Sequence, residues 1–448
     1  MTVKIKKGLD IRMKGKAVFN LISVPETELF ALKPTDFPGL TPKLVVKPDD
    51  KVKVGSPLFY DKYRPEVKFT SPVSGIVAAV NRGERRRILE VVVKSDNKNT
   101  AVEFKVDNLP SMSGEDVIKI LLSSGLWPII RQRPFNIIAN PGDKPRAIFI
   151  SGFDSAPLAP DLNFVLQGLN EVFQKGVDVL SKLTTGKIHI GVKAKTLEDS
   201  VFKSLNNVEI TEFSGPHPAG NVGIQIHHTD PVNKGEVVWV VNPQDVVMIG
   251  RLFDKGVLDT ERVIAFVGSE VINPIYYKTK LGVSIKEMTE TNTSGTNLRY
   301  ISGNALTGTA INREGYIGYY HQQLTVIPEG NYHEPFGWMM PRLNKFSISM
   351  SYFSWMMPKK EFSFDTNLNG GKRNFVMTGQ YEKVFPMNIY PVELLKAIII
   401  EDFDLMENLG IYEVAEEDMA LCEFVCTSKT EVQSILRKGF DYILKELG

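Results

Sequence analysis

Cysteine is nearly missing from this 448-residue sequence, in which Cys422 and Cys426 are the only two. Two thiols exclude a disulfide framework, and they are too few ligands for an ordinary iron–sulfur cluster. Because they lie four residues apart, they would share one face of a helix, where packing in the core is the usual role of such a pair.

Long apolar runs and an excess of one charge are missing as well. No run approaches the ~18 residues of a membrane-spanning helix, and Met1–Lys7 does not lead into the apolar region of a signal peptide. We therefore expect a cytosolic chain that reaches a membrane only through partners. Lysine and arginine total 53 against 52 aspartates and glutamates, so we expect no nucleic acid as a partner.

Motifs for nucleotides and metals are also lacking. Gly152–Ser155 does not continue as a dinucleotide loop, and Thr185–Ile188 lacks the flanking residues of a phosphate-binding loop. If His227 and His228 lie in a strand, they point to opposite faces, and no cysteine or carboxylate at ligand spacing joins them. We expect this chain to hold no flavin, nucleotide or metal of its own.

The sequence that is present divides into regions with different patterns. Its length predicts about three domains. Between Leu44 and Val93, short strands and tight turns predict a small β-barrel or sandwich, which resembles the barrel-sandwich of biotinyl and lipoyl carrier domains. From Ala147 to Val267, apolar β-rich runs alternate with helical patterns, which favours a Rossmann-like α/β sheet with Val263–Val267 as its last strand.

Two further regions complete the chain. From Lys280 to Gly330 the Gly, Thr and Asn content rises and the strands shorten, which predicts a small β-rich module. The last hundred residues show a helical pattern, with Pro391 in the first turn of one helix. We therefore expect domains at residues 1–105, 106–268, 269–332 and 333–448.

The stretch Gly125–Asn140 joins the first two regions and carries the strongest signal for a working surface. Trp127 and Phe135 are too apolar for an ordinary linker, yet Pro128 and Pro134 interrupt a regular helix or central strand. We expect these side chains to be covered either by a ligand or by their own domain.

Arginines give this stretch a second property. Arg131 and Arg133 add planar, permanently charged donors, which suit a ligand with carbonyl or phosphate oxygens and an apolar body. The alternative is a loop packed on its own domain, with both guanidinium groups in water. Lys33 and Phe37, within Lys33–Gly39, offer the same mixture of groups.

A segment rich in aromatic residues and methionine runs from Phe336 to Phe364. Trp338, Trp355 and Met356 are its most prominent members. Such density exceeds what a solvated linker needs, so the segment is either core or an adaptable docking surface for partners.

Several segments, taken together, resemble the NqrA family, which provides one subunit of the bacterial sodium-translocating NADH:quinone oxidoreductases. They span nearly the whole length in the family's order: Met1–Gly15, Leu44–Val80, Gly125–Phe135, His217–Gly220, Asn242–Val247, Arg299–Gly303, Tyr381–Met387 and Glu416–Lys429. Thr427 stands where the family usually has proline, a departure that bears only on the local turn.

The resemblance implies a multidomain α/β plus β fold, similar to the flavin-binding subunit of respiratory complex I and to the related C component of the Rnf complex. Its parts would be a biotinyl/lipoyl-like barrel-sandwich, a Rossmann-like α/β domain, an SLBB-like β-grasp module and a C-terminal helical domain. It further implies a peripheral subunit on the cytoplasmic face of the bacterial inner membrane, placed against the membrane-embedded B component of the complex. Flavins and the iron–sulfur cluster would lie in partner subunits, and quinone would be the substrate.

The residues and the resemblance leave three functions open. In the first, the chain helps to form or cover the site where ubiquinone or menaquinone is reduced to quinol, coupled to Na⁺ export. The residues expected beside quinone are Lys33, Phe37, Trp127, Arg131, Arg133 and Phe135. In the second, the chain is an assembly scaffold without quinone contact. The third, a free-standing NADH-binding flavoprotein, is disfavoured because the glycine loop is absent.

Overall fold

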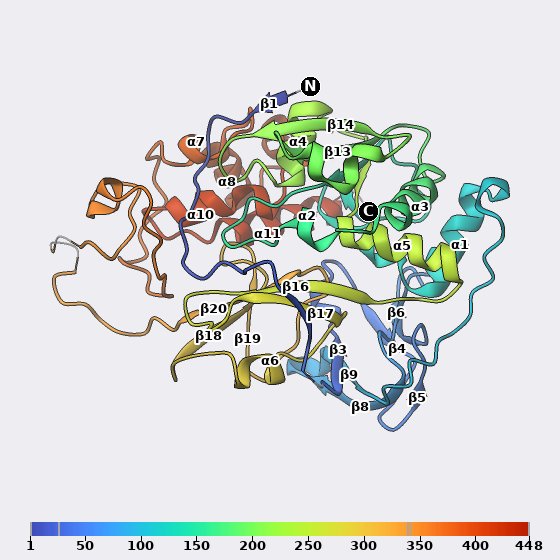
Figure 1. The fold of residues 1–448 in the computed structure, drawn as a ribbon. Coiled ribbons are helices and arrows are strands. Elements are labelled where there is room, and N and C mark those ends of the chain that lie inside the picture. Colours follow the sequence, from blue (N-terminus) through green and yellow to red (C-terminus); the bar gives the residue numbers. More distant parts are fainter. Residues whose placement is uncertain (1, 26, 338–339, 341, 447–448) are drawn as a thin grey trace.

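The largest sheet of the computed structural model, which describes residues 2–25, 27–337, 340 and 342–446, has seven strands in the order β1-β14-β13-β12-β15-β10-β11 (Figure 1). The first five strands are parallel, and β10 and β11 add an antiparallel hairpin. Their bounds are Thr2–Lys4, Glu209–Ser214, Ile188–Lys193, Ile148–Ser151, Val238–Val240, Arg131–Arg133 and Ile137–Ile138.

Helices cover both faces of this sheet. Phe149 of β12 packs with α4 (Val222–Thr229), whereas Ile148 and Ile150 point to the opposite face, into the core that α3 (Asn170–Ser181) and α5 (Pro243–Lys255) share. A strand buried on both faces needs a continuous apolar run, which explains the sequence pattern. The predicted α/β region is therefore confirmed.

A second sheet has six strands in the order β19-β18-β20-β16-β17-β2. The bounds are Thr309–Ile311, Leu298–Ser302, Gln323–Pro328, Glu261–Val267, Ile275–Lys280 and Leu21–Ser23, and α6 (Lys286–Glu290) lies beside them. The expectation that Val263–Val267 closes the α/β sheet is wrong, because β16 pairs with β17 and β20. Asp245 of α5 and Arg262 of β16 form a buried ion pair that ties the two sheets together.

The predicted barrel-sandwich is formed by two small sheets. One has the order β3-β9-β8-β5 and the other β4-β6-β7. The bounds are Leu29–Leu32, Ile88–Ser95, Gly75–Arg82, Lys51–Val52, Pro42–Leu44, Pro57–Asp61 and Lys68–Thr70. Phe59 and Phe69 stack at 4.7 Å between ring centroids and are buried in its core.

The C-terminal region is helical, as the sequence predicts. Its helices are α7 (Tyr381–Val384), α8 (Pro391–Ile399), α9 (Phe403–Asn408), α10 (Ala420–Val425) and α11 (Val432–Glu446), and Pro391 lies in the first turn of α8. Cys422 and Cys426 are both buried among these helices. None of the helices in the described ranges is long and apolar enough to cross a membrane.

Between the second sheet and the helical region, the described residues of the range 331–380 form little regular structure and extend away from the packed body on the left of Figure 1. The N-terminal segment anchors this extension. The Lys14 amide donates to the Phe362 carbonyl at 2.9 Å, and the Arg12 guanidinium donates to the carbonyls of Ser354 and Met357.

An ion pair between a buried arginine and a half-buried glutamate joins the α/β sheet to the helical region. Arg133 of β10 is 3% exposed, and its Nη2 lies 2.8 Å from Oε1 of Glu417. Asn221, at the start of α4, donates from Nδ2 to the Glu417 carbonyl at 2.9 Å. The carboxylate of Asp418 lies against Gly223, where a Cβ would come within 2.1 Å of Oδ2. We call these five residues the joint.

Charge in the joint is unevenly balanced. Burial would raise the pKa of Glu417, but the charges of Arg133 and Arg131 outweigh it and hold that pKa below its ordinary value. Burial is also the main cause that raises the pKa of Asp418, to about 7, and the Glu417 charge adds to it. Asp418 therefore keeps its proton in the folded protein at mildly acidic pH.

Titration of Asp418 should make stability fall as the pH rises. In the unfolded chain the carboxyl loses its proton near pH 4, and in the folded chain only near pH 7. Between these two pH values the Asp418 carboxyl is more often protonated in the folded state than in the unfolded state. Its contribution to the free energy of unfolding is therefore largest near pH 4 and is lost as the pH rises to about 7. Burial lowers the pKa of His217 and of His321, which adds stability as the pH rises and opposes this effect. We therefore expect the thermal midpoint of wild type to fall relative to that of an Asp418 variant without the titrating group from pH 5 to pH 8.

The variant Asp418→Asn isolates this effect, because its side-chain oxygen can still accept from the Ala415 amide. It should remove part of the pH dependence, and the exposed Asp404→Asn should leave it intact. An equal slope in wild type and Asp418→Asn would contradict the assignment.

Candidate functional site

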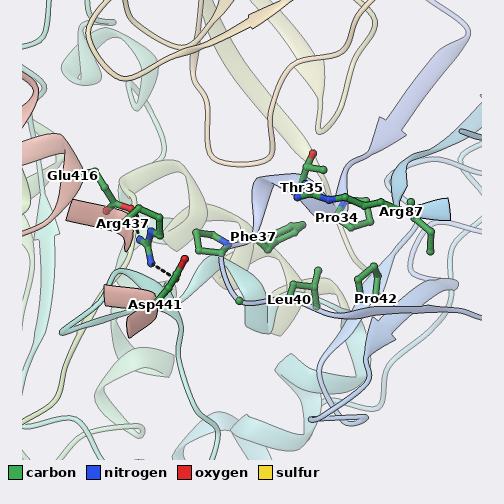
Figure 2. Close-up of a pocket in the computed structure, with 12 residues that line it drawn as sticks. Pro34, Thr35, Phe37, Leu40, Pro42, Arg87, Glu416, Arg437 and Asp441 are labelled. Carbon is green, nitrogen blue, oxygen red and sulfur yellow. Dashed lines mark hydrogen bonds and ion pairs between the residues drawn. The ribbon is translucent and has the colours of Figure 1, made fainter. Parts of the chain in front are cut away.

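A cleft of about 420 Å³ lies between the barrel-sandwich and helix α11, within the size range of small-molecule sites. The segment after β3 and the start of β9 line one wall with Pro34, Thr35, Phe37, Pro38, Gly39, Leu40, Pro42, Arg87 and Ile88. The helical region lines the other wall with Glu416, Arg437 and Asp441. Figure 2 shows these residues facing one another across the cleft.

Phe37 supplies an aromatic part of the first wall. It is 3% exposed, because its ring packs on Phe69, Tyr319 and Tyr320 at 4.6, 4.9 and 5.7 Å between centroids. The ring is therefore fixed by the core behind it. Of the predicted residues, Phe37 alone is among those that line the cleft.

Lys33 has a different position from the one expected. Its Nζ donates to the Tyr316 carbonyl at 3.0 Å and lies 3.6 Å from Asp36. Burial raises the pKa of the Asp36 carboxyl, and the Lys33 charge opposes that rise. The lysine thus fixes the segment that carries Phe37 instead of lining the cleft.

Arg437 of the second wall has a guanidinium group whose three nitrogens differ in their hydrogen bonds. Its Nε donates to Glu416 Oε1 at 2.6 Å, and its Nη2 donates to the Phe135 carbonyl at 3.0 Å. Its Nη1 is buried without a hydrogen-bond partner and lies 3.9 Å from Asp441. The guanidinium is therefore held by Glu416 and the Phe135 carbonyl on one side, and it lies beside the Asp441 carboxylate at the wall of the cleft.

Arg131 lies behind both walls of the cleft. Its guanidinium is 5.1 Å from the centroid of the Tyr320 ring, which in turn packs on Phe37. Its Nη1 also donates to Asn136 Oδ1 at 3.2 Å, and Asn136 donates to Glu416 at 3.3 Å. Arg131 therefore supports the cleft from behind, through contacts with both sides.

Arg133 belongs to the joint and Phe135 lies beside it, and neither residue lines the cleft. The Arg133 side chain is buried against Glu417. Phe135 is 7% exposed and packs edge-on against Tyr412 and Phe440. Both residues hold the helical region in place, and only the Phe135 carbonyl contacts a cleft residue.

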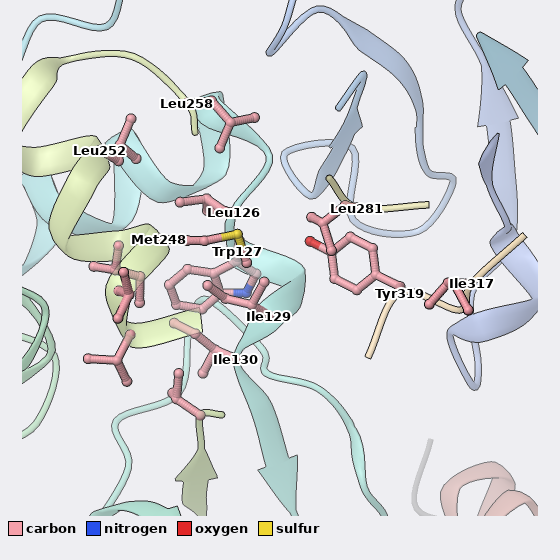
Figure 3. Close-up of a cluster of buried hydrophobic side chains, with 14 of the residues drawn as sticks. Leu126, Trp127, Ile129, Ile130, Met248, Leu252, Leu258, Leu281, Ile317 and Tyr319 are labelled. Carbon is pink, nitrogen blue, oxygen red and sulfur yellow. The ribbon is translucent and has the colours of Figure 1, made fainter. Parts of the chain in front are cut away.

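Trp127 lies in the core and has no exposed surface, which agrees with the alternative that this stretch packs on its own domain. Its indole N–H donates to the Ala139 carbonyl at 2.8 Å, and its ring meets that of Trp239 edge-on at 5.3 Å. Figure 3 shows it between its own turn and the side chains of Met248 and Leu252 from α5. The proline-bounded stretch is covered by its own domain.

The candidate docking residues lie on the extension. Trp355 is 54% and Met356 is 61% exposed, although Arg12 holds the backbone beside them. Trp338 lies outside the described residues. The extension therefore presents large apolar side chains on an anchored backbone.

The histidine pair lies in a helix and not in a strand. His227 and His228 are in α4, where Nδ1 of His227 is 2.7 Å from Glu413 and Nε2 accepts from the Asn388 amide at 3.0 Å. Within the described residues no three His, Cys, Asp or Glu side chains gather as a possible metal site.

Comparison with known proteins agrees with this architecture. Family models match residues 3–96 as the NqrA N-terminal barrel-sandwich hybrid domain, 112–258 as the NqrA second alpha/beta domain and 263–313 as the NQRA C-terminal domain. The third match begins at residue 263, within two residues of the start of β16 at Glu261. This boundary agrees with the pairing of β16 in the second sheet and not in the α/β sheet.

Relatives extend the match to the full length. A protein of Yersinia pestis bv. Antiqua (strain Angola) is 42% identical over 448 residues, which cover 99% of this chain and 100% of the relative. One from Neisseria meningitidis serogroup B is 42% identical over 449 residues with the same coverage. Both are named as the NqrA-type subunit of the Na(+)-translocating NADH-quinone reductase. The chain therefore belongs to the NqrA family of the Na⁺-translocating NADH-quinone reductase, and it is a subunit of that oxidoreductase complex.

Proposed function

We propose that this chain forms part of the quinone site of the reductase, with the cleft as its contribution. In this proposal it lies on the cytoplasmic face of the bacterial inner membrane, against the membrane-embedded B component. Flavins and the iron–sulfur cluster of partner subunits deliver the electrons. Ubiquinone or menaquinone is reduced to quinol, and the complex couples that reduction to Na⁺ export.

The observation that carries the proposal is the composition of the cleft. A quinone head needs an apolar slot for its ring and a donor for each carbonyl. Prolines, Phe37, Leu40 and Ile88 supply apolar surface, and Arg87 and Arg437 approach from opposite walls (Figure 2). Two guanidinium groups on opposite sides match the two carbonyl oxygens on opposite edges of a quinone ring.

Arg437 has a defined task in this proposal. In this proposal its Nη1, which has no hydrogen-bond partner and lies 3.9 Å from Asp441, turns toward the cleft and donates to one carbonyl oxygen, while Glu416 and the Phe135 carbonyl keep the guanidinium oriented. Negative charge develops on that oxygen as electrons arrive, and a fixed cation beside it stabilises the charge without reorganisation. Arg131 and Arg133 act indirectly, because they hold Glu416 and Glu417 in place.

Removal of the Arg437 guanidinium should weaken quinone binding. A hydrogen bond from a charged donor is worth ~1.5–3 kcal/mol, so Arg437→Gln should raise the Michaelis constant for quinone by roughly ten- to a hundredfold. The measurement is steady-state quinone reduction by the assembled reductase. Arg313→Gln, an exposed arginine on another domain, is the matched control and should change nothing.

Because Arg437 also supports the joint, a second variant is needed. Thr35→Trp places bulk in the cleft from an exposed position and should raise the same constant with little change in thermal stability. A normal Michaelis constant and turnover in both variants would place quinone wholly outside this chain and leave the scaffold function.

The alternative function, an assembly scaffold, is favoured by the exposed side chains of the extension. Trp355 and Met356 expose more apolar surface than an isolated soluble chain tolerates well. In the complex they would lie against a partner subunit. This role is compatible with the quinone proposal, because one chain can both dock and line a site.

Charge placed on the extension should impair assembly more than folding. Trp355→Asp and Met356→Asp would each force a carboxylate against an apolar partner surface, so the variants should be lost from the purified complex. Trp355→Phe, which keeps the apolar ring, should be retained. Thermal melting of the isolated chains is the folding control, and full retention of the Asp variants would show that the extension is not a docking element.

A further inference from the structure

A second exposed apolar surface lies on the helical region, where α8 ends and α9 begins. Ile399 and Ile400 are 53% and 68% exposed, and Leu405 of α9 is 39% exposed. Two neighbouring isoleucines this exposed are unusual, since β-branched aliphatic side chains are among those most often buried. We call these three residues the isoleucine corner.

Carboxylates surround the isoleucine corner. Glu401, Asp402 and Asp404 are in or next to the turn that follows the isoleucines directly. Within the described parts of the chain, none of the three forms an ion pair. Lys396 is the one cation between Pro391 and Asn408, and Lys234 from outside this range pairs with Glu407 of α9. Glu401, Asp402 and Asp404 therefore supply the carboxylates beside the exposed isoleucines.

The corner is also rigid. Ile398, the neighbour of the exposed pair, is buried where α8 meets α11, and a Cβ on Gly439 would come within 2.9 Å of it. Asp402 caps α9 by accepting from the Leu405 amide at 3.0 Å. A surface held in this way loses little conformational entropy on binding.

The geometry points to the isoleucine corner as a docking surface for a basic cytoplasmic loop of a membrane-embedded subunit. Cytoplasmic loops of membrane proteins carry an excess of Lys and Arg, which the surrounding carboxylates complement, and an apolar side chain of the loop covers Ile399 and Ile400. The inference rests on the proposed position of this chain beside a membrane subunit, and it specifies the surface and the charge of the partner.

Charge also argues against two other occupants. The cytoplasmic leaflet is negative, so its lipid surface repels an acidic corner. A second copy of this chain, docked corner to corner, would bring like charges together, which costs free energy. A loop with basic residues and an apolar side chain is the partner that can pair with the carboxylates and also cover the isoleucines.

The position of the corner gives docking a consequence for the cleft. Helix α8 packs on α11 at Gly439, and α11 also carries Arg437 and Asp441 of the cleft. A loop bound at the corner therefore holds the helix that supplies one wall of the cleft. Docking at the isoleucine corner would thus affect the position of Arg437 and Asp441 in the cleft through the packing of α8 on α11.

The test measures binding of the purified chain to detergent-solubilised reductase that lacks it. Wild type should bind, with a Kd that rises with salt because screening weakens the charge pairs. The double variant Glu401→Lys/Asp404→Lys should raise the Kd about tenfold or more at low salt and reduce its salt dependence. Ile399→Ser/Ile400→Ser should weaken binding at every salt concentration.

Matched controls are Glu66→Lys, an exposed carboxylate on the barrel-sandwich, and Ile272→Ser, an exposed isoleucine in the connection between β16 and β17. Both should bind as wild type does. Vesicles of anionic lipid should not bind wild type. If both corner variants bind as tightly as wild type, the corner is not an interface, although the chain still joins the complex. If wild type itself does not bind, the position beside a membrane subunit fails together with the corner.

Discussion

A buried guanidinium must have a carboxylate beside it, and in this chain that requirement joins two regions far apart in the sequence. Arg133 contacts Glu417 at 2.8 Å with almost no access to solvent. Removing one partner of such a pair typically costs about 3–5 kcal/mol, since a buried charge is left uncompensated. The helical region is thus fixed on the α/β sheet by electrostatics as well as by apolar packing.

The candidate site follows from this constraint. Glu416 adjoins Glu417, so the joint also fixes the carboxylate that orients Arg437. Arg437 faces a barrel-sandwich wall that is itself held by the packing of Phe37 on Tyr319 and Tyr320. The cleft exists because two regions far apart in the sequence are both packed on the α/β sheet and face each other, and ligand sites commonly form between such regions.

Much of the architecture follows from sequence patterns. The barrel-sandwich, the α/β alternation and the C-terminal helices each have a local signal in turn residues or apolar periodicity. The sequence pattern places Val263–Val267 in the wrong sheet because a buried apolar strand has the same composition in either one. Only its pairing with β17 and β20 decides the matter.

The site is harder to predict than the fold. Trp127 and Phe135 have the composition of a binding loop, but core and ligand surfaces use the same residue types, and burial alone distinguishes them. Phe37 is identifiable because proline, lysine and an aromatic residue are neighbours there. Arg437 gives no local signal, since it lies on an amphipathic helix like any solvated arginine, and its partner Glu416 is brought to it only by tertiary packing.

Contact between quinone and this chain in the cleft can be observed directly. The most direct measurement is a high-resolution structure of the assembled reductase with a bound quinone analogue. If quinone binds there, density for the ring lies between Phe37 and Arg437, with a carbonyl oxygen within hydrogen-bond distance of Nη1 of Arg437. Density for the ring solely within the membrane subunits, with this cleft filled by solvent or by another subunit, would contradict this contact.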